Sequence, residues 1–362
     1  MNKTMSELEK LAIQIADDFL KNGYFEPSLG SVSPATSQIS TDKNDFYNFD
    51  SLRGGFAGLS VQGVGCAEIE GHVQIYVYVV KGNKRKLNSL FCAIHDIPVK
   101  AVKVGKTIIK PETVSTATNR GKIFTKNGRV ACGSSCQPAG EHYAGTLGAI
   151  VQKENKFFAL SNNHVFAACN HTRVGQPIMS PSSMDAGPNI PAPRLIARHS
   201  EILELRSGDP YLVPLISLDA AVAEIDPEAV TSWQGSENEG GYDTPNVYTT
   251  PSPGMLVKKI GRTTGLTLGT IEAKVPGQWY LEYKSKKFTA TVWFQNIWTI
   301  RTTETPYFAL PGDSGSLIVT NDAKQAVGLL FAASQNGEYG YIFPIENILR
   351  AFNAQLVSNY GL

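Results

Sequence analysis

The sequence predicts a mainly β protein with a small α/β unit at its N-terminus and a helix at its C-terminus. Apolar residues recur at helical spacing at the two ends of the chain, and two strand patterns follow the first helix. From residue 146 onward, short apolar runs are separated by turns rich in glycine and proline. Many short strands joined in this way are typical of β-barrels and β-sandwiches. The length of 362 residues allows two domains, or one large domain with an extension.

The first expected element is an amphipathic helix that starts near Met5 and stops at Gly23. Its apolar residues recur at intervals of three and four, and Ser6 is the candidate N-cap. Acidic and basic residues balance on its polar face, whereas a helix that lies on a membrane favours Lys and Arg there. We therefore expect this helix to pack against the protein or a second copy. Residues 27–55 lack periodicity and are expected as a linker, so that the first segment is 1–55.

A small α/β unit is expected over residues 56–105. Residues 61–69 and 73–80 have the pattern of two strands joined by a Glu70-Gly71 turn. A third strand is expected at 97–104, after a short polar stretch.

The β-rich domain is expected over residues 145–362, after a second linker at 106–144 that mixes Thr, Gly, Lys and Ser. Its expected strands are the short apolar runs 147–151, 157–161, 220–225, 255–260, 268–273, 288–294, 316–319, 327–332 and 340–343. After Pro344 the apolar residues return to helical spacing, and proline suits the first turn of a helix. A C-terminal helix is therefore expected to close the chain.

Composition and charge exclude several classes of protein. Hydrophobic residues make up 42% and charged residues 18% of the chain, which suits a globular protein better than a disordered one. Lys and Arg number 33 against 32 Asp and Glu, so a formal charge of +1 attracts neither nucleic acid nor anionic lipid. No apolar run approaches the length of a membrane span, and the N-terminus lacks a secretion signal. We therefore expect a cytoplasmic protein without nucleic-acid or membrane partners.

The cysteines are expected to be free thiols. They are five in number, scattered at positions 66, 92, 132, 136 and 169, and so do not form the even framework of a small secreted scaffold. Cys132 and Cys136, with Cys169, His142 and His171, would have the residue types of a zinc site, but no second spaced pair accompanies them. No metal and no cofactor are expected.

The strongest chemical signal is the motif GDSG at residues 312–315. Glycine permits a tight turn and the close approach of a substrate carbonyl. The backbone N–H groups of Gly312 and Ser314 would then point at one oxygen, which is the arrangement of an oxyanion hole. The alternative is a surface turn before a strand, because Gly, Asp and Ser are common turn residues.

A nucleophilic serine needs a base, and the base needs a carboxylate to orient it. Among six histidines, only His164 stands where an apolar strand ends, after two asparagines. Asp219 opens an apolar segment and would be partly buried, where an imidazole N–H is a suitable partner. Asp209 and Asp226 each precede proline and are expected in turns. A structural histidine and a backbone-bonded aspartate remain the alternatives.

The chain order His164, Asp219, Ser314 is the order of chymotrypsin. Over residues 145–356 the sequence resembles the chymotrypsin-like (trypsin-like) serine peptidases, through NHV at 163–165, LDAA at 218–221 and GDSG at 312–315. Further segments resemble the bacterial cytosolic branch and its plant narrow-leaf relatives: GTLGA at 145–149, ALSNNHV at 159–165, GRTTG at 261–265 and GVG at 63–65. The resemblance implies two six-stranded β-barrels with the triad between them, and peptide-bond hydrolysis through an acyl-enzyme.

The resemblance also implies a specificity pocket and a way in which the enzyme is activated. The pocket would be flanked by six apolar residues, which favours a small or apolar substrate residue: Phe308, Ala309, Leu310, Phe331, Ala332 and Ala333. Secreted members are activated when a new N-terminus pairs with the aspartate before the nucleophile, here Asp313. The chain has no Ile-Val-Gly-Gly start, so intrinsic or partner-driven ordering is expected instead. GRTTG lacks the lysine and spacing of a phosphate-binding loop and is expected as a β-hairpin turn.

These observations predict an intracellular serine endopeptidase that is regulated by its N-terminal region or by partners. A protein or peptide substrate, a homo-oligomer and a regulatory protein or ligand are the expected partners. The alternative is a catalytically silent or conditionally active trypsin-like scaffold that binds peptides as an oligomer. A carboxylester hydrolase is also open, because acyl transfer to serine does not require an amide.

Overall fold

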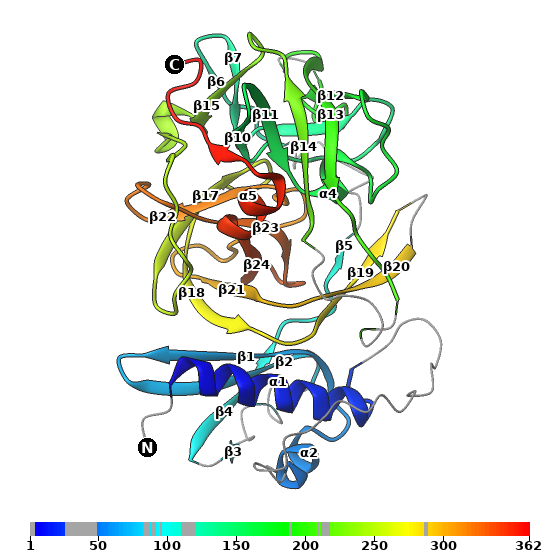
Figure 1. Cartoon of the computed structure of the whole chain (residues 1–362), viewed down its shortest axis with the longest axis vertical. Helices are drawn as coiled ribbons and strands as arrows, with labels where there is room; N and C mark the ends of the chain where they lie inside the picture. The colour runs from blue at the N-terminus through cyan, green and yellow to red at the C-terminus, as the bar shows by residue number, and fades with distance from the viewer. Residues whose placement is uncertain are drawn as a thin grey trace.

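The computed structural model has two stacked β units above a smaller N-terminal unit (Figure 1). It describes residues 4–25, 49–82, 87, 92–94, 96–109, 121–187, 190–208, 210, 218–285 and 289–362. The expected linker residues 27–48 and the expected turn at Asp209 lie outside the described residues. The prediction of a mainly β fold with a helix at each end is confirmed. No helix in the described part of the chain is long and apolar enough to cross a membrane.

The N-terminal helix α1 (Met5–Lys21) packs its apolar face against the N-terminal sheet. Its buried residues are Leu8, Leu11, Ala12, Ile15, Ala16 and Phe19. They share one hydrophobic core with the short helix α2 (Asp50–Phe56) and with strands β1 (Ser60–Ile69) and β2 (His72–Lys81). The amphipathic pattern is thus explained by packing within the chain.

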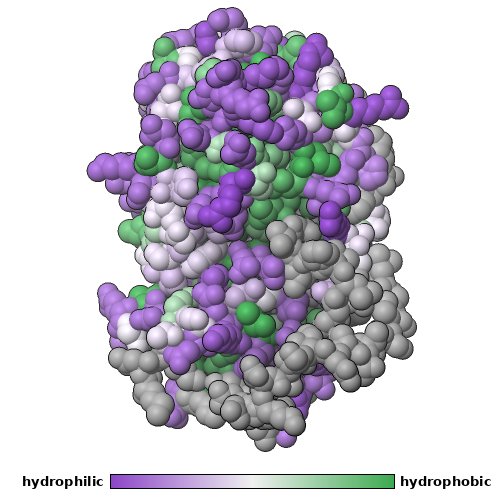
Figure 2. Space-filling view, viewed as in Figure 1, coloured by the Kyte–Doolittle hydropathy of each residue, from purple (hydrophilic) through white to green (hydrophobic). Residues whose placement is uncertain are grey.

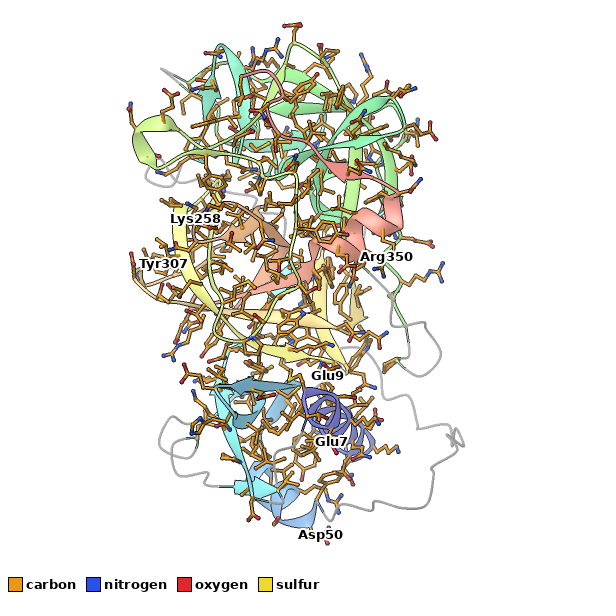
Figure 3. The ribbon with its side chains drawn as sticks, turned by 60° about the vertical axis from the view of Figure 1, so that its left-hand side comes forward. Glu7, Glu9, Asp50, Lys258, Tyr307 and Arg350 are labelled. Carbon is orange, nitrogen blue, oxygen red and sulfur yellow. The ribbon has the colours of Figure 1, made fainter. Side chains whose placement is uncertain are left out.

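The start of α1 corrects the expectation that Ser6 is the N-cap. The cap is Thr4, whose hydroxyl accepts a hydrogen bond from the Glu7 backbone N–H. The Glu7 carboxylate, labelled in Figure 3, accepts in return from the Thr4 backbone N–H over 2.7 Å. This reciprocal pair is a capping box, and it places Ser6 inside the first turn.

Replacing Thr4 by alanine is expected to lower the free energy of unfolding by about 1 kcal/mol, because the hydrogen bonds of the Thr4 hydroxyl to the Glu7 N–H and to the Glu7 carboxylate are lost. Ser6→Ala is the matched control, since Ser6 is exposed and lies within the helix; its effect should stay below about 0.5 kcal/mol. Urea unfolding followed by circular dichroism measures both values. Equal losses in the two variants would contradict the cap at Thr4.

The N-terminal sheet continues the sheet of the second β unit. Strands β1 and β2 form the predicted hairpin, with positive φ angles at the Glu70-Gly71 turn. Beyond β2 the sheet adds β4 (Ile97–Lys103) and β3 (Cys92–Ile94). On its other edge β1 pairs with β18 (Gly265–Val275) of the second β unit. A Cβ atom at Gly63 would lie 2.5 Å from the Trp279 ring, so glycine allows this close approach.

The first β unit is built from two sheets. One has the order β25-β10-β11-β14-β13-β12-β8-β9 and the other β16-β15-β7-β6. Their bounds are β6 (Thr125–Lys126), β7 (Arg129–Cys132), β8 (Ser135–Pro138), β9 (Gly145–Thr146), β10 (Ala149–Lys153), β11 (Lys156–Ser161), β12 (Pro177–Ser180), β13 (Arg194–Leu203), β14 (Ala220–Ile225), β15 (Val230–Gln234), β16 (Tyr242–Asp243) and β25 (Gln355–Leu356). The helix α4 (Asn163–Phe166) follows β11, and a short 3₁₀ helix spans Glu237–Glu239.

The second β unit closes on itself. Six strands run in the order β17-β22-β23-β24-β21-β18, and β17 also pairs with β18. A separate sheet has the order β20-β19-β5. The remaining bounds are β5 (Ile108–Ile109), β17 (Leu256–Gly261), β19 (Trp279–Lys284), β20 (Thr289–Phe294), β21 (Ile297–Thr302), β22 (Leu317–Thr320), β23 (Ala326–Ala333), β24 (Tyr339–Pro344) and the C-terminal helix α5 (Ile345–Phe352). GRTTG forms the turn of the β17–β18 hairpin, as predicted.

The described parts of the expected linker at 106–144 contain the short strands β5, β6, β7 and β8. β5 pairs with β19, β7 pairs with β15, and β8 pairs with β12 and β9, while β6 pairs with β7. The stretch 132–136 is fully buried although it consists of Cys, Gly and Ser. Small residues of this kind resemble a loop in sequence, whereas here their size lets strands pack closely.

The surface in Figure 2 is mostly hydrophilic, with a hydrophobic area near the middle of the visible face. The exposed large hydrophobic residues of the described part of the chain are Ile13, Ile69, Val174, Val247, Tyr248, Leu256, Tyr307 and Leu362.

Candidate active site

A cavity of about 780 Å³ is lined by residues from both β units and from the segment that follows the N-terminal sheet. The first β unit contributes residues 140–144 and His164, and the second contributes residues 309–312 and Ser314. The cavity thus brings the candidate base and the candidate nucleophile, 150 positions apart in the numbering, to one site.

The structure pairs His164 with Asp219. His164 lies on α4 directly after β11, and Asp219 directly precedes β14, the neighbouring antiparallel strand. His164 Nδ1 and Asp219 Oδ2 are 2.5 Å apart, and the His164 backbone N–H donates to Asp219 Oδ1 over 3.1 Å. The Asn162 side chain donates to the Asp219 carbonyl oxygen, which ties the two strand ends together. The Asp219 side chain has no exposed surface, and the His164 side chain is 10% exposed.

The turn after α4 has a left-handed backbone at three successive residues, Ala168, Cys169 and Asn170. Side chains other than glycine rarely adopt this conformation, so it has to be held by other contacts. Asn163 and Asn170 supply them: the Asn163 side chain accepts from the Asn170 N–H over 2.9 Å and donates to Asn170 Oδ1 over 2.7 Å. The sequence motif marked Asn163 only as a strand breaker. Its role is to brace the turn that lines the cavity beside His164.

The loop that carries Ser314 is held by the Asp313 carboxylate. Asp313 is fully buried and accepts from the backbone N–H groups of Thr263, Thr264 and Leu310 over 2.8, 3.1 and 2.9 Å. The Thr264 hydroxyl donates to the same carboxylate over 2.8 Å. The GRTTG hairpin turn therefore serves as the anchor of the nucleophile loop.

The cation that faces Asp313 is Lys259 of β17. Its Nζ lies 3.4 Å from Asp313 Oδ2, and neither side chain has any exposed surface. Lys259 Nζ also donates to the Thr264 hydroxyl. Burial lowers the pKa of Lys259, while the charge of Asp313 and the hydrogen bond to it act in the opposite direction. Among the described residues, Lys259 thus supplies a cation to the buried Asp313 carboxylate.

The two backbone N–H groups expected to form the oxyanion hole have no acceptor among the described residues. The neighbouring carbonyls are held in place: Thr263 Oγ1 donates to the Pro311 oxygen over 2.7 Å, and Thr146 Oγ1 donates to the Gly312 oxygen over 2.8 Å. In a trans peptide the C=O and N–H groups point in opposite directions. The bond to the Pro311 oxygen therefore turns the Gly312 N–H away from Thr263. Gly312 and Ser314 both line the cavity.

The Ser314 hydroxyl donates to the Phe331 carbonyl oxygen over 3.1 Å rather than to His164. The structure therefore brings His164 and Asp219 into contact and places Ser314 in the same cavity with its hydroxyl turned aside. A serine side chain has three staggered positions, and catalytic hydrogen bonds often tighten only when substrate binds. His164 and Ser314 thus line one cavity, and their union in a triad stays a prediction.

The six residues expected at the specificity pocket divide into two groups. Ala309, Leu310, Ala332 and Ala333 line the cavity. Phe308 and Phe331 do not: both are fully buried, and Phe331 stacks on Phe343 with ring centroids 4.1 Å apart. The rings of Phe308 and Phe331 lie in hydrophobic cores instead, and the specificity pocket itself stays a prediction.

Residues that follow the N-terminal sheet also line the cavity, which the sequence did not indicate. They are Lys106, Thr107 and Ile109. The Lys106 ammonium lies 2.8 Å from the Glu282 carboxylate of β19, and the Val104 carbonyl accepts from the Gln335 N–H over 3.0 Å. The N-terminal unit is therefore joined to the wall of the cavity.

The described cysteines Cys66, Cys132, Cys136 and Cys169 are free and buried. Burial raises the pKa of the Cys66 thiol to about 12 and raises those of the other three as well. In the described ranges, His, Cys, Asp and Glu form no cluster of three or more that could hold a metal ion.

Comparison with known proteins finds likeness in solved structures. No family profile and no curated protein matches the sequence. Chymotrypsin of Cellulomonas bogoriensis covers 63% of this chain and 98% of its own, at 17% identity and a TM-score of 0.41. Protease A of Thermobifida fusca covers 63% and 100%, at 19% identity and 0.44. A protease of Nocardiopsis covers 62% and 97%, at 19% identity and 0.42.

The predicted mainly β architecture is confirmed by the sheets: six strands close into a barrel in the second unit, and two sheets form the first. The resemblance to the bacterial cytosolic branch and its plant narrow-leaf relatives stays a prediction.

Proposed function

We propose that this protein is a serine endopeptidase whose triad is His164, Asp219 and Ser314. The observation that carries the proposal is that a histidine bonded to a buried carboxylate lines the same cavity as Ser314. These are the groups that acyl transfer to serine requires, because the hydroxyl needs a base and the base needs a fixed orientation.

In the proposed reaction, Ser314 Oγ attacks the scissile carbonyl carbon while His164 Nε2 takes the hydroxyl proton. Asp219 holds the other ring nitrogen, and its negative charge stabilises the imidazolium that forms. The N–H groups of Gly312 and Ser314 bind the oxyanion of the tetrahedral intermediate. His164 then gives the proton to the leaving amine, and water releases the acyl group by the same steps in reverse.

The apolar residues of the expected specificity pocket that line the cavity support a small or apolar residue on the acyl side of the cleaved bond. Ala309, Leu310, Ala332 and Ala333 have no charge to pair with a lysine or arginine. The Lys259–Asp313 ion pair supports activity without cleavage of the chain, because a cation already neutralises the buried aspartate. Four buried free thiols support a reducing compartment, which we take to be the cytoplasm.

We place regulation in the N-terminal unit. Lys106, Thr107 and Ile109 form part of the cavity wall, so movement of this unit would change the space open to substrate. The second candidate function is a conditionally active scaffold that binds peptides. It is favoured by the bond from the Ser314 hydroxyl to the Phe331 carbonyl, which gives the hydroxyl proton to a backbone oxygen instead of to the base.

Fluorophosphonate labelling tests the proposal, because this reagent traps only a serine that its own site activates. We expect one adduct per wild-type chain, located on Ser314 by mass spectrometry, together with cleavage of unfolded casein. Ser314→Ala should take up no label, and His164→Ala should label far more slowly. Equal labelling of all three proteins would overturn the proposal. A folded wild type that neither labels nor cleaves casein would favour the scaffold.

A further inference from the structure

A tyrosine outside every sequence motif contacts both members of the His164–Asp219 pair. The Tyr283 hydroxyl donates to Asp219 Oδ2 over 2.8 Å, and this is the oxygen that also bonds to His164 Nδ1. The Tyr283 ring meets the imidazole edge-on, with centroids 5.9 Å apart and an angle of 70° between the rings. Tyr283 is therefore built into the environment of the proposed base.

The fold holds Tyr283 from both sides. It lies on β19 opposite Ala290 of β20 and opposite Ile109 of β5, so its strand is paired along both edges. The side chain is fully buried and also packs against the Phe294 ring. Burial and the nearby Asp219 charge raise the pKa of Tyr283 well above its ordinary value, so the phenol keeps its proton.

The hydrogen bond of the Tyr283 hydroxyl joins two separate sheets. Asp219 and His164 belong to the sheet of β11 and β14, whereas Tyr283 belongs to the separate sheet β20-β19-β5. A buried carboxylate needs hydrogen-bond donors for its lone pairs. The Asp219 carboxylate has three: the backbone N–H of His164, the imidazole and the phenol. Rotation of the carboxylate would break at least one of these bonds.

We propose that Tyr283 is a positioning residue, which holds the Asp219 carboxylate in the orientation that keeps the proton on His164 Nδ1. With that proton fixed, Nε2 is left to accept the proton of Ser314. The effect on rate rests on the proposed peptidase function. The effect on the Nδ1 proton does not, because the hydrogen bonds exist in the folded chain without substrate.

Tyr283→Phe removes the hydroxyl and keeps the ring. We expect kcat for peptide hydrolysis to fall about 10- to 100-fold with KM unchanged, because one hydrogen bond to a charged group is lost. In an Asp219→Asn background the same change should have almost no further effect, because the two residues act through one hydrogen bond. We also expect the downfield proton resonance of His164 Nδ1, assigned by its loss in His164→Ala, to change position in Tyr283→Phe.

Tyr280→Phe is the matched control. Tyr280 lies on the same strand and is buried, but it packs against Phe25 and Trp293 on the opposite face. It should leave kcat, KM and the resonance unchanged. A Tyr283→Phe variant that matches Tyr280→Phe in both kcat and the position of the resonance would overturn the inference. So would a Tyr283→Phe change that lowers kcat as much in the Asp219→Asn background as it does in the wild type. If the wild type proves inactive, the proposed function fails, and the resonance alone decides the role of Tyr283.

Discussion

His164→Ala and Ser314→Ala are each expected to lower kcat by about 10⁶, and the double variant is expected to lose no more than either one alone. The reason is that the two groups carry out one step: without the base the hydroxyl is a weak nucleophile, and without the hydroxyl the base has no proton to take. The residual rate should be that of the backbone N–H groups of Gly312 and Ser314 together with substrate binding. Asp219→Asn should lower kcat by a smaller factor, about 10⁴, because the amide leaves the geometry intact and fixes the wrong tautomer of His164.

The measurement is the hydrolysis of one peptide substrate under saturating conditions, normalised by the fraction of folded protein. KM should stay near the wild-type value in all variants, because none of these side chains is expected to bind the substrate in its ground state. Unfolding curves serve as a control for His164→Ala, since removal of the imidazole leaves Asp219 with one donor fewer in a buried place. Losses that multiply in the double variant would contradict a shared step.

Several of the elements follow from local sequence patterns, and the absence of others from the prediction has a physical cause. Apolar runs marked β10, β11 and β14 because each is buried with little polar content. The sequence does not predict β13 and β19, because polar residues interrupt their apolar pattern. In β19 the interruption is Glu282, which is buried and lies 2.8 Å from the Lys106 ammonium. Its partner comes from a distant segment, so no window of the sequence around β19 could reveal it.

Some residues of the candidate site can be predicted from the local sequence, and others cannot. His164, Asp219 and Ser314 stand at strand ends or in a glycine-flanked turn, and these local features can be recognised in a sequence. Tyr283 and Lys259 stand inside strands and have the composition of ordinary strand residues. Tyr283 lies 64 positions from Asp219, and Lys259 reaches Asp313 because β17 pairs with β22, the strand that follows Asp313. Residues that support a site across two sheets can be found only once the sheets are assembled.

Lys259→Met is expected to lower the free energy of unfolding by about 3–5 kcal/mol and kcat by about 10²- to 10³-fold. The loss of stability follows because Asp313 would remain charged and buried without a cation. The loss of rate follows because Asp313 lies between Gly312 and Ser314, whose N–H groups are proposed to bind the oxyanion. Lys258→Met is the matched control: Lys258, labelled in Figure 3, is the adjacent residue, and its Nζ lies 4.7 Å from the centroid of the Tyr242 ring. Lys258→Met should lower the free energy of unfolding by less than about 1 kcal/mol.

Two further variants separate the charge of Lys259 from its place in the core. In Lys259→Met combined with Asp313→Asn the uncompensated charge is gone, so we expect part of the stability to return; the rate should stay low, because an amide cannot accept all the bonds that hold the loop. Urea unfolding and the rate of fluorophosphonate labelling give the two readouts. The labelled wild type should also have the mass of the uncut chain plus one adduct, because the cation for Asp313 comes from within the chain. Equal behaviour of Lys259→Met and Lys258→Met would contradict this role, and a label found only on a cleaved chain would show that Asp313 needs a new N-terminus after all.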